Sequence, residues 1–273
     1  MTVMMNELSW LDYQARIHQA RITPGSTTNT ATGSDREPAM VFLPVGALEQ
    51  HGPHLPLGTD ALLATAVSAD IARAVDGLVA PTLNYGYKSQ PRCGGGQHFC
   101  GTTSVDAATL IGGVRDAVRG LGAHGLQRLV VVNGHYENQW FITEGIDLGL
   151  RDLGPDATLR VVRLEYWDFM TEALLADVFP EGFPGFALEH AAVIETSLML
   201  HYHPNLVKLD QIPQHGPAIF PTYDTHPARP RWVPITGVLS SARGATADKG
   251  QRMAAEVAQR IAAAMRAEFA EAT

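Results

Sequence analysis

The chain has 273 residues, 45% of them hydrophobic, which is enough for one α/β domain with a sizeable core. Its formal net charge is −8 with only 18% charged residues and no long basic run, which excludes an electrostatic footprint for nucleic acid. No apolar run reaches the roughly 18 residues of a membrane span and no secretory leader is visible, so we expect a cytoplasmic protein without a membrane partner. Two cysteines, Cys93 and Cys100, do not make a disulfide framework.

The first part of the chain predicts a helix, a loop and a buried strand. Ser9 is suited to cap the N-terminus of an amphipathic helix over residues 10–20. Residues 24–38, PGSTTNTATGSDREP, are polar and rich in turn-forming residues, so they predict a surface loop. The apolar run over residues 40–45 is short enough for one buried strand, and it leads into a polar loop that holds Glu49, His51, His54 and Asp60.

This polar loop has the residue types of a metal site. Glu49 and His51 are two residues apart, so in an extended segment both side chains point the same way. Asp60 opens a predicted helix over residues 60–74, and a negative charge is favoured at that end of a helix. Two carboxylates and an imidazole just after a strand indicate metal binding, although a loop with surface histidines is the alternative for this stretch alone.

A second strand end repeats the pattern. Residues 128–132 predict another buried strand, which runs into NGHYEN, where His135 and Glu137 are again two residues apart. Ligands of parallel sheets gather at the carboxyl ends of strands, so both pairs are expected at one edge. Five candidate ligands exceed the needs of one tetrahedral ion and predict two divalent ions about 3.5–4 Å apart that share a water; they are Glu49, His51, Asp60, His135 and Glu137.

The rest of the chain predicts alternating strands and helices. Apolar runs predict strands over residues 78–81 and 159–164, and helical periodicity predicts helices over residues 105–123, 138–153, 189–202 and 246–269. Strands of this apolar kind favour a mostly parallel sheet covered on both faces. The Gly-rich segment 84–103 lacks the Lys-Ser/Thr of a phosphate-binding loop and is expected to be an active-site wall. The proline-rich segment 214–234 is expected at an interface.

Several of these stretches resemble the creatininase (creatinine amidohydrolase) family. LPVGALEQHGPHLPLGTD and VNGHYENQ are similar to the two signature stretches of that family, and the likeness continues through NYGYKSQ, GGGQHFCGTTS, EHAAVIETSLML and LSSARGATADKGQ. It covers nearly all of the chain from Glu7 onward. The resemblance implies one domain over residues 1–273, an α/β fold built as a three-layer α/β/α sandwich with a mostly parallel central sheet, and a homohexamer. Residues 24–38 are then an insertion relative to the family.

The resemblance also implies a division of labour in the site. Glu49, Asp60 and His135 would bind one ion, and His51, Asp60 and Glu137 the other, the ions being zinc or manganese. A bridging hydroxide would attack an amide carbonyl, and His190 would deliver a proton to the leaving nitrogen. The catalytic residues so implied are His190 and Glu137, and the substrate contacts are Cys93, Gly134, Tyr136, Trp167 and Phe186.

The implied activity is hydrolysis of the C–N bond of a cyclic amide in a small, nitrogen-rich ring, with creatinine or a related lactam as the small-molecule substrate. Creatininases tend to carry a tryptophan in the lid where this chain has Phe186. A metal-dependent deformylase or peptidase of the wider family therefore stays open as the alternative. A third possibility, a metal-binding protein without activity, is disfavoured by the complete ligand set together with His190.

Overall fold

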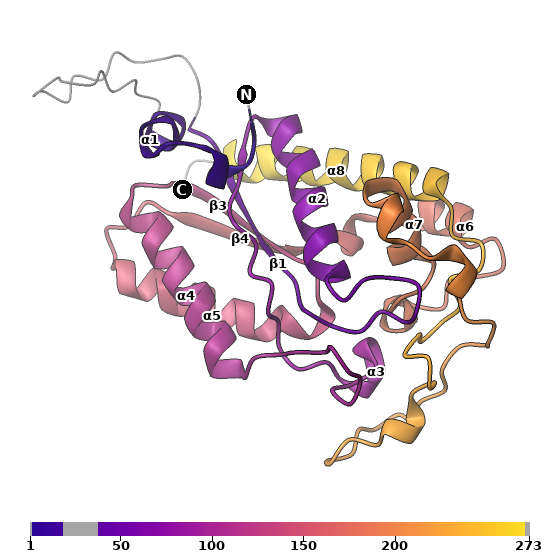
Figure 1. The fold of residues 1–273 in the computed structure, drawn as a ribbon. Coiled ribbons are helices and arrows are strands. Elements are labelled where there is room, and N and C mark those ends of the chain that lie inside the picture. The colour runs from indigo at the N-terminus through magenta and orange to yellow at the C-terminus, as the bar shows by residue number, and fades with distance from the viewer. Residues whose placement is uncertain (1, 19–37, 271–273) are drawn as a thin grey trace, which may run out of the picture.

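A computed structural model describes residues 2–18 and 38–270 and shows helices on both sides of one central sheet (Figure 1). The insertion predicted over residues 24–38 lies outside the described residues, apart from Pro38. The first helix, α1 (Trp10–Ile17), begins as predicted, because the Ser9 side chain accepts a hydrogen bond from the backbone N–H of Asp12. No helix within the described ranges is long and apolar enough to span a membrane.

The sheet is wholly parallel within the described residues, as the apolar strand runs predicted. Its strands are β1 (Val41–Val45), β2 (Leu78–Val79), β3 (Arg128–Asn133) and β4 (Arg160–Glu165), in the order β2-β1-β3-β4. Val45 pairs with Asn133, and Asn133 pairs with Glu165, so the carboxyl ends of three strands finish level. The loops that leave these strands therefore start from one edge.

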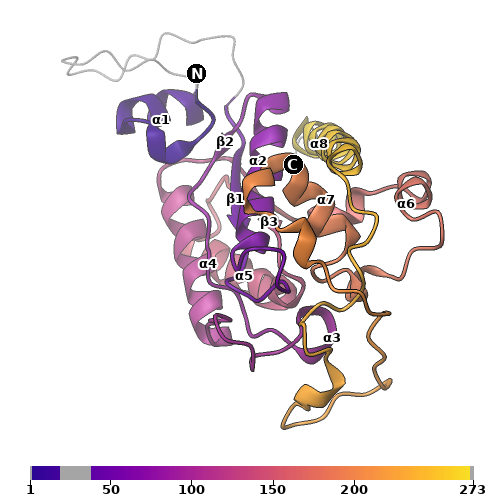
Figure 2. The same ribbon diagram turned by 45° about the vertical axis from the view of Figure 1, so that its right-hand side comes forward.

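Helices cover both faces of the sheet, which confirms the three-layer prediction (Figure 2). One face is covered by α2 (Thr59–Val75), α7 (Val193–Tyr202) and α8 (Ala247–Ala270), with Phe42 and Val132 in the core between. The other is covered by α1, α4 (Ala107–Ala123) and α5 (Gln139–Leu153), over Leu43 and Val131. The central strands β1 and β3 thus bury side chains on both faces, which is why their sequences do not alternate with polar residues.

Helices α4 and α5 approach each other closely along a pair of glycines. A Cβ atom on Gly145 would lie 2.7 Å from Val114 Cβ and 2.8 Å from the carbonyl oxygen of Ile111. A Cβ atom on Gly149, one turn later, would lie 2.8 Å from Val118 Cβ. The two helices can pack at this distance only because neither position has a side chain. This contact holds α5 in place, and the first turn of α5 directly follows the loop that contains His135 and Glu137.

The strand order creates a crevice at the carboxyl edge. The chain leaves β1, returns through α2 to β2 on one side, and then enters β3 on the other side of β1. The connections that follow β1 and β3 cover opposite faces of the sheet, so their loops diverge and leave a space between them. Such a switch point is where open α/β sheets bind their ligands.

Two elements differ from the prediction. The helix expected over residues 189–202 begins only at Val193, because Ala191 has a φ of 54°, in the left-handed region. The turn is held by two carboxylates: Glu189 accepts the N–H of Ile194, and Glu195 accepts the N–H of Ala191. His190 therefore lies in the turn before α7 and not in the predicted helix. A further helix, α6 (Glu172–Val178), was not predicted at all, although Thr171 caps it. A short helical turn, α3 (Pro91–Gly94), interrupts the Gly-rich wall.

Candidate active site

A pocket of about 480 Å³, including its solvent-open mouth, lies at the carboxyl edge of the sheet. Loops after β1, β3 and β4 form its floor and sides, while α3 and the segment before α7 complete the wall. The residues that line it are Glu49, Asp60, Cys93, Gly134, His135, Tyr136, Glu137, Tyr166, Trp167, Phe186, Glu189, His190, Ile194 and Glu195. The pocket therefore joins segments that are up to about 150 residues apart in the sequence.

One group of possible metal ligands consists of Glu49, Asp60 and His135. His135 Nδ1 lies 3.0 Å from Glu49 Oε2 and 3.0 Å from Asp60 Oδ2, and all three residues are buried. The other ring nitrogen, Nε2, lies 3.1 Å from the carbonyl oxygen of Tyr87, which can only accept a hydrogen bond. Nε2 is therefore the protonated nitrogen, and Nδ1 presents its lone pair to the two carboxylates, as a metal-binding histidine does.

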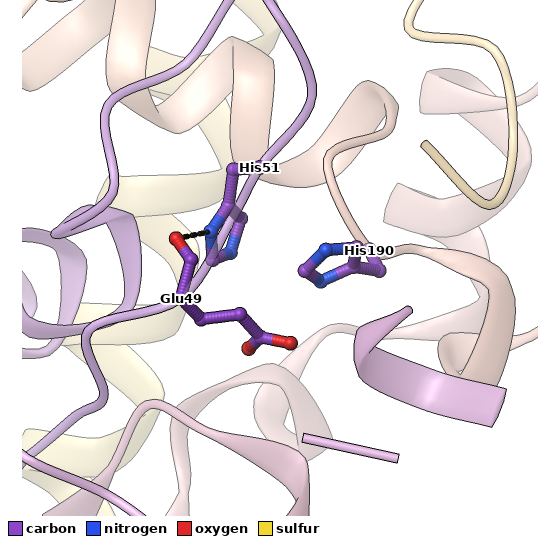
Figure 3. A group of neighbouring side chains, drawn as sticks. All are labelled: Glu49, His51 and His190. Carbon is purple, nitrogen blue, oxygen red and sulfur yellow. Dashed lines mark hydrogen bonds between the residues drawn. The ribbon is translucent and has the colours of Figure 1, made fainter. Parts of the chain in front are cut away.

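A second group consists of His51, Asp60 and Glu195. His51 Nε2 lies 2.9 Å from Asp60 Oδ1 and 3.6 Å from Glu195 Oε1. His51 Nδ1 donates to the carbonyl oxygen of Glu49 at 3.1 Å, a contact that is drawn in Figure 3. Nε2 thus faces two carboxylates, in the same way as Nδ1 of His135, and would present a lone pair to a cation bound between them. Burial alone would lower the pKa of His51, but the charges on Asp60 and Glu195 raise it well above its usual value.

These donors fit divalent cations. Among the described residues, four buried atoms in or beside the pocket have no hydrogen bond: His51 Nε2, Asp60 Oδ2, Glu137 Oε2 and Glu189 Oε1. Buried polar atoms are rarely left unpaired in folded proteins, and a cation between His51 and Asp60 would satisfy two of these atoms. The two groups share Asp60, with one carboxylate oxygen directed to each histidine. Mixed oxygen and nitrogen ligands of this kind suit zinc and manganese alike.

A third group of possible ligands consists of Glu49, His51 and His190, and Glu137, predicted as a metal ligand, lies outside all three groups. Its Oε1 accepts the backbone N–H of Gln90 at 2.7 Å, and its Oε2 lies 3.4 Å from His135 Nε2. Burial raises the pKa of Glu137 to about 7. The place beside His51 is taken instead by Glu195, which the sequence reasoning missed. The only signal for Glu195 was its position in the first turn of a helix next to His190, because no strand end or short spacing marks it.

His190 comes from a different segment of the chain and faces Glu49 and His51, as Figure 3 shows. Its ring centre lies 4.4 Å from that of His51, and its Nε2 lies 2.7 Å from the side-chain nitrogen of Gln50. Burial and the nearby positive charge of His51 lower the pKa of His190 well below its usual value. His190 is therefore neutral in this arrangement.

All five predicted substrate contacts line the same pocket, namely Cys93, Gly134, Tyr136, Trp167 and Phe186. The rings of Tyr136 and Trp167 are nearly parallel, at 13° with centres 6.3 Å apart. Phe186 meets Phe183 edge to face at 4.8 Å. Burial raises the pKa of the Cys93 thiol to about 12, so Cys93 is a neutral wall group. Two other loop histidines do not line the pocket: His98 packs on Phe99, and His54 is bonded to Thr196.

The fold and the paired ligand groups are those of an α/β metal-binding protein with a concave site, and known proteins place it further. The family model described as "Creatininase: Creatinine amidohydrolase" matches residues 26–265. The creatinine amidohydrolase of Pseudomonas putida is 47% identical over 271 residues, which is 98% of each chain. The mycofactocin precursor peptide peptidase of Mycobacterium ulcerans (strain Agy99) is 34% identical over 80% of each chain.

Solved structures agree with this likeness. A mutant creatininase complexed with creatine superposes with a TM-score of 0.89 at 46% identity, over 98% of this chain and 99% of that chain. A Zn-Zn form of a mutant creatininase and a manganese form give the same TM-score, identity and coverage. The protein therefore belongs to the creatininase (creatinine amidohydrolase) family, as the sequence motifs predicted.

Proposed function

We propose that this protein hydrolyses the ring amide bond of creatinine or a closely related lactam. The observation that carries the proposal is the pair of histidine–carboxylate groups that share Asp60 at the floor of a pocket walled by Tyr136 and Trp167. The 47% identity to the Pseudomonas putida creatinine amidohydrolase over nearly the full chain supports the substrate. The creatine complex of a related creatininase supports a small-molecule ligand.

We assign the metal ligands from the two groups rather than from sequence spacing. Glu49, Asp60 and His135 would hold one ion, and His51, Asp60 and Glu195 the other. Two bound divalent ions would polarise the amide carbonyl and supply hydroxide from water near neutral pH. This assignment replaces Glu137 by Glu195 in the second site and leaves the Glu137 carboxyl group available for proton transfer.

Glu137 is suited to carry the proton that hydrolysis must move. Burial raises the pKa of its carboxyl group to about 7, and bound cations would lower this pKa toward the ionised form that accepts a proton. It would take one proton from the attacking water and give it to the ring nitrogen as the C–N bond breaks. The net change is the addition of one water across that bond, with Glu137 restored. The carboxyl group is oriented for this step by the N–H of Gln90.

Aromatic residues would hold the ring of the substrate. Tyr136 and Trp167 present nearly parallel faces, and planar rings stack well on such faces. Phe186 supplies a further aromatic surface from the lid segment but has no N–H to donate. A substrate that needs such a donor would bind less tightly, by about 1–3 kcal/mol if a buried polar group were left unpaired. We therefore expect creatinine hydrolysis that Phe186→Trp improves.

Steady-state kinetics on zinc- and manganese-loaded protein tests this function. The substrates are creatinine, other small lactams, formamides and short peptides, each assayed with wild type and Phe186→Trp. Phe99→Trp is the matched control, because Phe99 does not line the pocket. Higher kcat/KM for creatinine in Phe186→Trp alone supports the proposal. Rapid cleavage of a formamide or peptide, with no lactam hydrolysed by any variant, would replace it.

Peptide hydrolysis is the second candidate, and one observation favours it. The mycofactocin precursor peptide peptidase is 34% identical over 80% of this chain, and its name describes a protein that cleaves peptides. Hydrolysis of a peptide bond and of a lactam is the same reaction, the addition of water across an amide C–N bond, so the same metal-binding groups could serve either substrate. The same substrate panel separates the two candidates.

We further propose that the enzyme works in the cytoplasm as a homohexamer. Both cysteines are free, which suits a reducing compartment. The proline-rich segment 214–234 exposes the apolar residues Ile219 and Tyr223, and Ile235 directly after it is exposed too, which suits contact with another subunit. Light scattering at micromolar concentration distinguishes a hexamer from a monomer.

A further inference from the structure

The side chain of Gln50 lies between the two ligands Glu49 and His51 in the sequence, yet it turns away to join three other segments. Its Oε1 lies 2.9 Å from the backbone N–H of Gly52. Its Nε2 lies 2.9 Å from the carbonyl oxygen of Gly237 and 3.3 Å from that of Gly94. The same Nε2 lies 2.7 Å from His190 Nε2. Gln50 is buried, so these are the groups that determine how its amide is oriented.

These partners leave only one orientation of the amide. The N–H of Gly52 is a donor and requires the oxygen of Gln50, while the carbonyl oxygens of Gly237 and Gly94 are acceptors and require the NH₂ group. The flipped amide would oppose donor to donor at Gly52 and acceptor to acceptor at Gly237. The NH₂ group has two hydrogens for three neighbours, so the two shorter contacts, to His190 Nε2 at 2.7 Å and to the Gly237 carbonyl at 2.9 Å, take one each, and the Gly94 carbonyl at 3.3 Å is the weaker contact.

A donor at that position determines the state of the imidazole. His190 Nε2 has to accept, so it carries the lone pair, and the proton of the neutral ring is on Nδ1. Among the described residues no contact to Nδ1 meets the distance and angle limits of a hydrogen bond, although the backbone carbonyl of Gln50 lies close enough to the ring to favour its protonated form, and the side chain lines the pocket. We propose that Gln50 is a positioning residue that fixes His190 as the Nδ1–H tautomer, so that His190 serves as a neutral hydrogen-bond donor to the substrate.

This role differs from the proton transfer that the family resemblance implied for His190. A neutral imidazole whose Nε2 is occupied by an amide donor has no free lone pair with which to collect a proton. Loss of the Nδ1 proton would leave an imidazolate anion, which a buried site disfavours. The Nδ1–H can instead stabilise the negative charge that develops on the carbonyl oxygen. The inference rests on the proposed amide hydrolysis, in which Glu137 carries the proton.

Two glycines leave the space that the side-chain amide of Gln50 occupies. A Cβ atom on Gly237 would lie 1.9 Å from Gln50 Oε1, and one on Gly95 would lie 2.7 Å from Gln50 Nε2. Both glycines have positive φ, 79° and 85°. In two separate loops, the position next to the Gln50 amide is thus a glycine, and any larger residue there would displace the amide. Gly237→Ala should therefore act on His190 through Gln50, without touching the pocket itself.

The tautomer can be measured without any substrate. Long-range ¹H–¹⁵N correlation spectra of zinc-loaded protein with ¹⁵N-labelled histidine distinguish the two neutral tautomers, and His190→Asn identifies the resonances. We expect an Nδ1–H pattern for His190 in wild type and in Gln97→Met, which removes an exposed glutamine. In Gln50→Met and Gly237→Ala this pattern should be lost, whereas Gly216→Ala, with open space at its Cβ position, should keep it. An Nε2–H pattern in wild type would overturn the proposal.

Kinetics then separate donation of a hydrogen bond from proton transfer. Asparagine can donate from near the position of Nδ1 but cannot transfer a proton at neutral pH. We expect His190→Asn to keep kcat within about tenfold of wild type, and His190→Ala to lose about 10²–10³, as when one oxyanion donor is removed. Gln50→Met should lower kcat by about 10–100-fold with KM and bound zinc little changed. Equal losses in His190→Asn and His190→Ala would refute the donor role. If no lactam is hydrolysed, the proposed function fails, while the spectra still decide the tautomer.

Discussion

Replacing Asp60 by asparagine is expected to remove both metal ions at once. Asp60 is 3% exposed in the first turn of α2, with Oδ1 2.9 Å from His51 Nε2 and Oδ2 3.0 Å from His135 Nδ1. Each carboxylate oxygen therefore serves a different histidine. Asparagine keeps the size of the side chain but has no negative charge, and its NH₂ group cannot bind a cation. Each ion thus loses a charged ligand from one substitution.

The size of the effect follows from the number of ligands. Four-ligand structural zinc sites bind with about 10–16 kcal/mol in total, or about 2.5–4 kcal/mol for each ligand. A loss of that size weakens binding by roughly 10²–10³-fold for each ion. We expect Asp60→Asn to hold neither ion after dialysis against a weak chelator and to have no measurable hydrolytic activity. Mass spectrometry of bound metals measures the outcome directly.

Asp116→Asn is the matched control. Asp116 is an exposed carboxylate on α4 that pairs only with Arg119 in the described part of the chain, so its loss should leave metal content and activity unchanged. Retention of both ions by Asp60→Asn would refute the shared ligand. Loss of one ion alone would mean that Asp60 belongs to a single site and that the two groups are not coupled through it.

Two further predictions concern the fold and the pH dependence of stability. Gly145→Ala should lower the free energy of unfolding by about 1–3 kcal/mol, because its Cβ would overlap Val114. Gly112→Ala on α4 meets open space and should instead stabilise the helix by about 0.5–1 kcal/mol. Denaturant titration measures both free energies, and equal effects of the two substitutions would contradict the close packing of α4 and α5. Burial raises the pKa of Glu189 to about 8, so the folded protein binds this proton more tightly than the unfolded chain. Stability should then fall as pH rises from about 4.5 to 8, by up to about 1.4 kcal/mol per pH unit, and thermal melts of Glu189→Gln should lack this component.

Local patterns were sufficient for the sheet and for most of the site. Strands β1 and β3 are short apolar runs because both of their faces are buried, and the ligand pairs follow each run directly. A residue placed just after a parallel strand has little choice of location, so Glu49, His51 and His135 could be assigned to one edge before any coordinates were known. The same reasoning placed Asp60 at the start of the helix that returns from that edge.

The positions that sequence did not predict depend on contacts between distant segments. Glu195 reaches His51 because the turn before α7 is held by Glu189 and by the left-handed Ala191. Nothing in the periodicity of residues 189–202 marks that turn, since its apolar residues suit a longer helix. The prediction of Glu137 as a ligand rests on its spacing to His135, and spacing does not reveal that its Oε1 accepts the backbone N–H of Gln90 while its Oε2 lies 3.4 Å from His135 Nε2.

His51, His135 and His190 differ in whether a ring nitrogen meets a hydrogen-bond acceptor or a hydrogen-bond donor of the protein. This difference separates their roles. His51 and His135 each give one N–H to a backbone carbonyl oxygen, that of Glu49 or of Tyr87, so the other nitrogen has a lone pair for a cation. His190 meets the NH₂ group of Gln50 instead, so its remaining nitrogen keeps a proton. An imidazole that donates a hydrogen bond to the protein can bind a metal ion through its other nitrogen. An imidazole that accepts a hydrogen bond from the protein can donate one to the substrate. The residue type is the same at all three positions, so the backbone and the neighbouring amide decide what each one does.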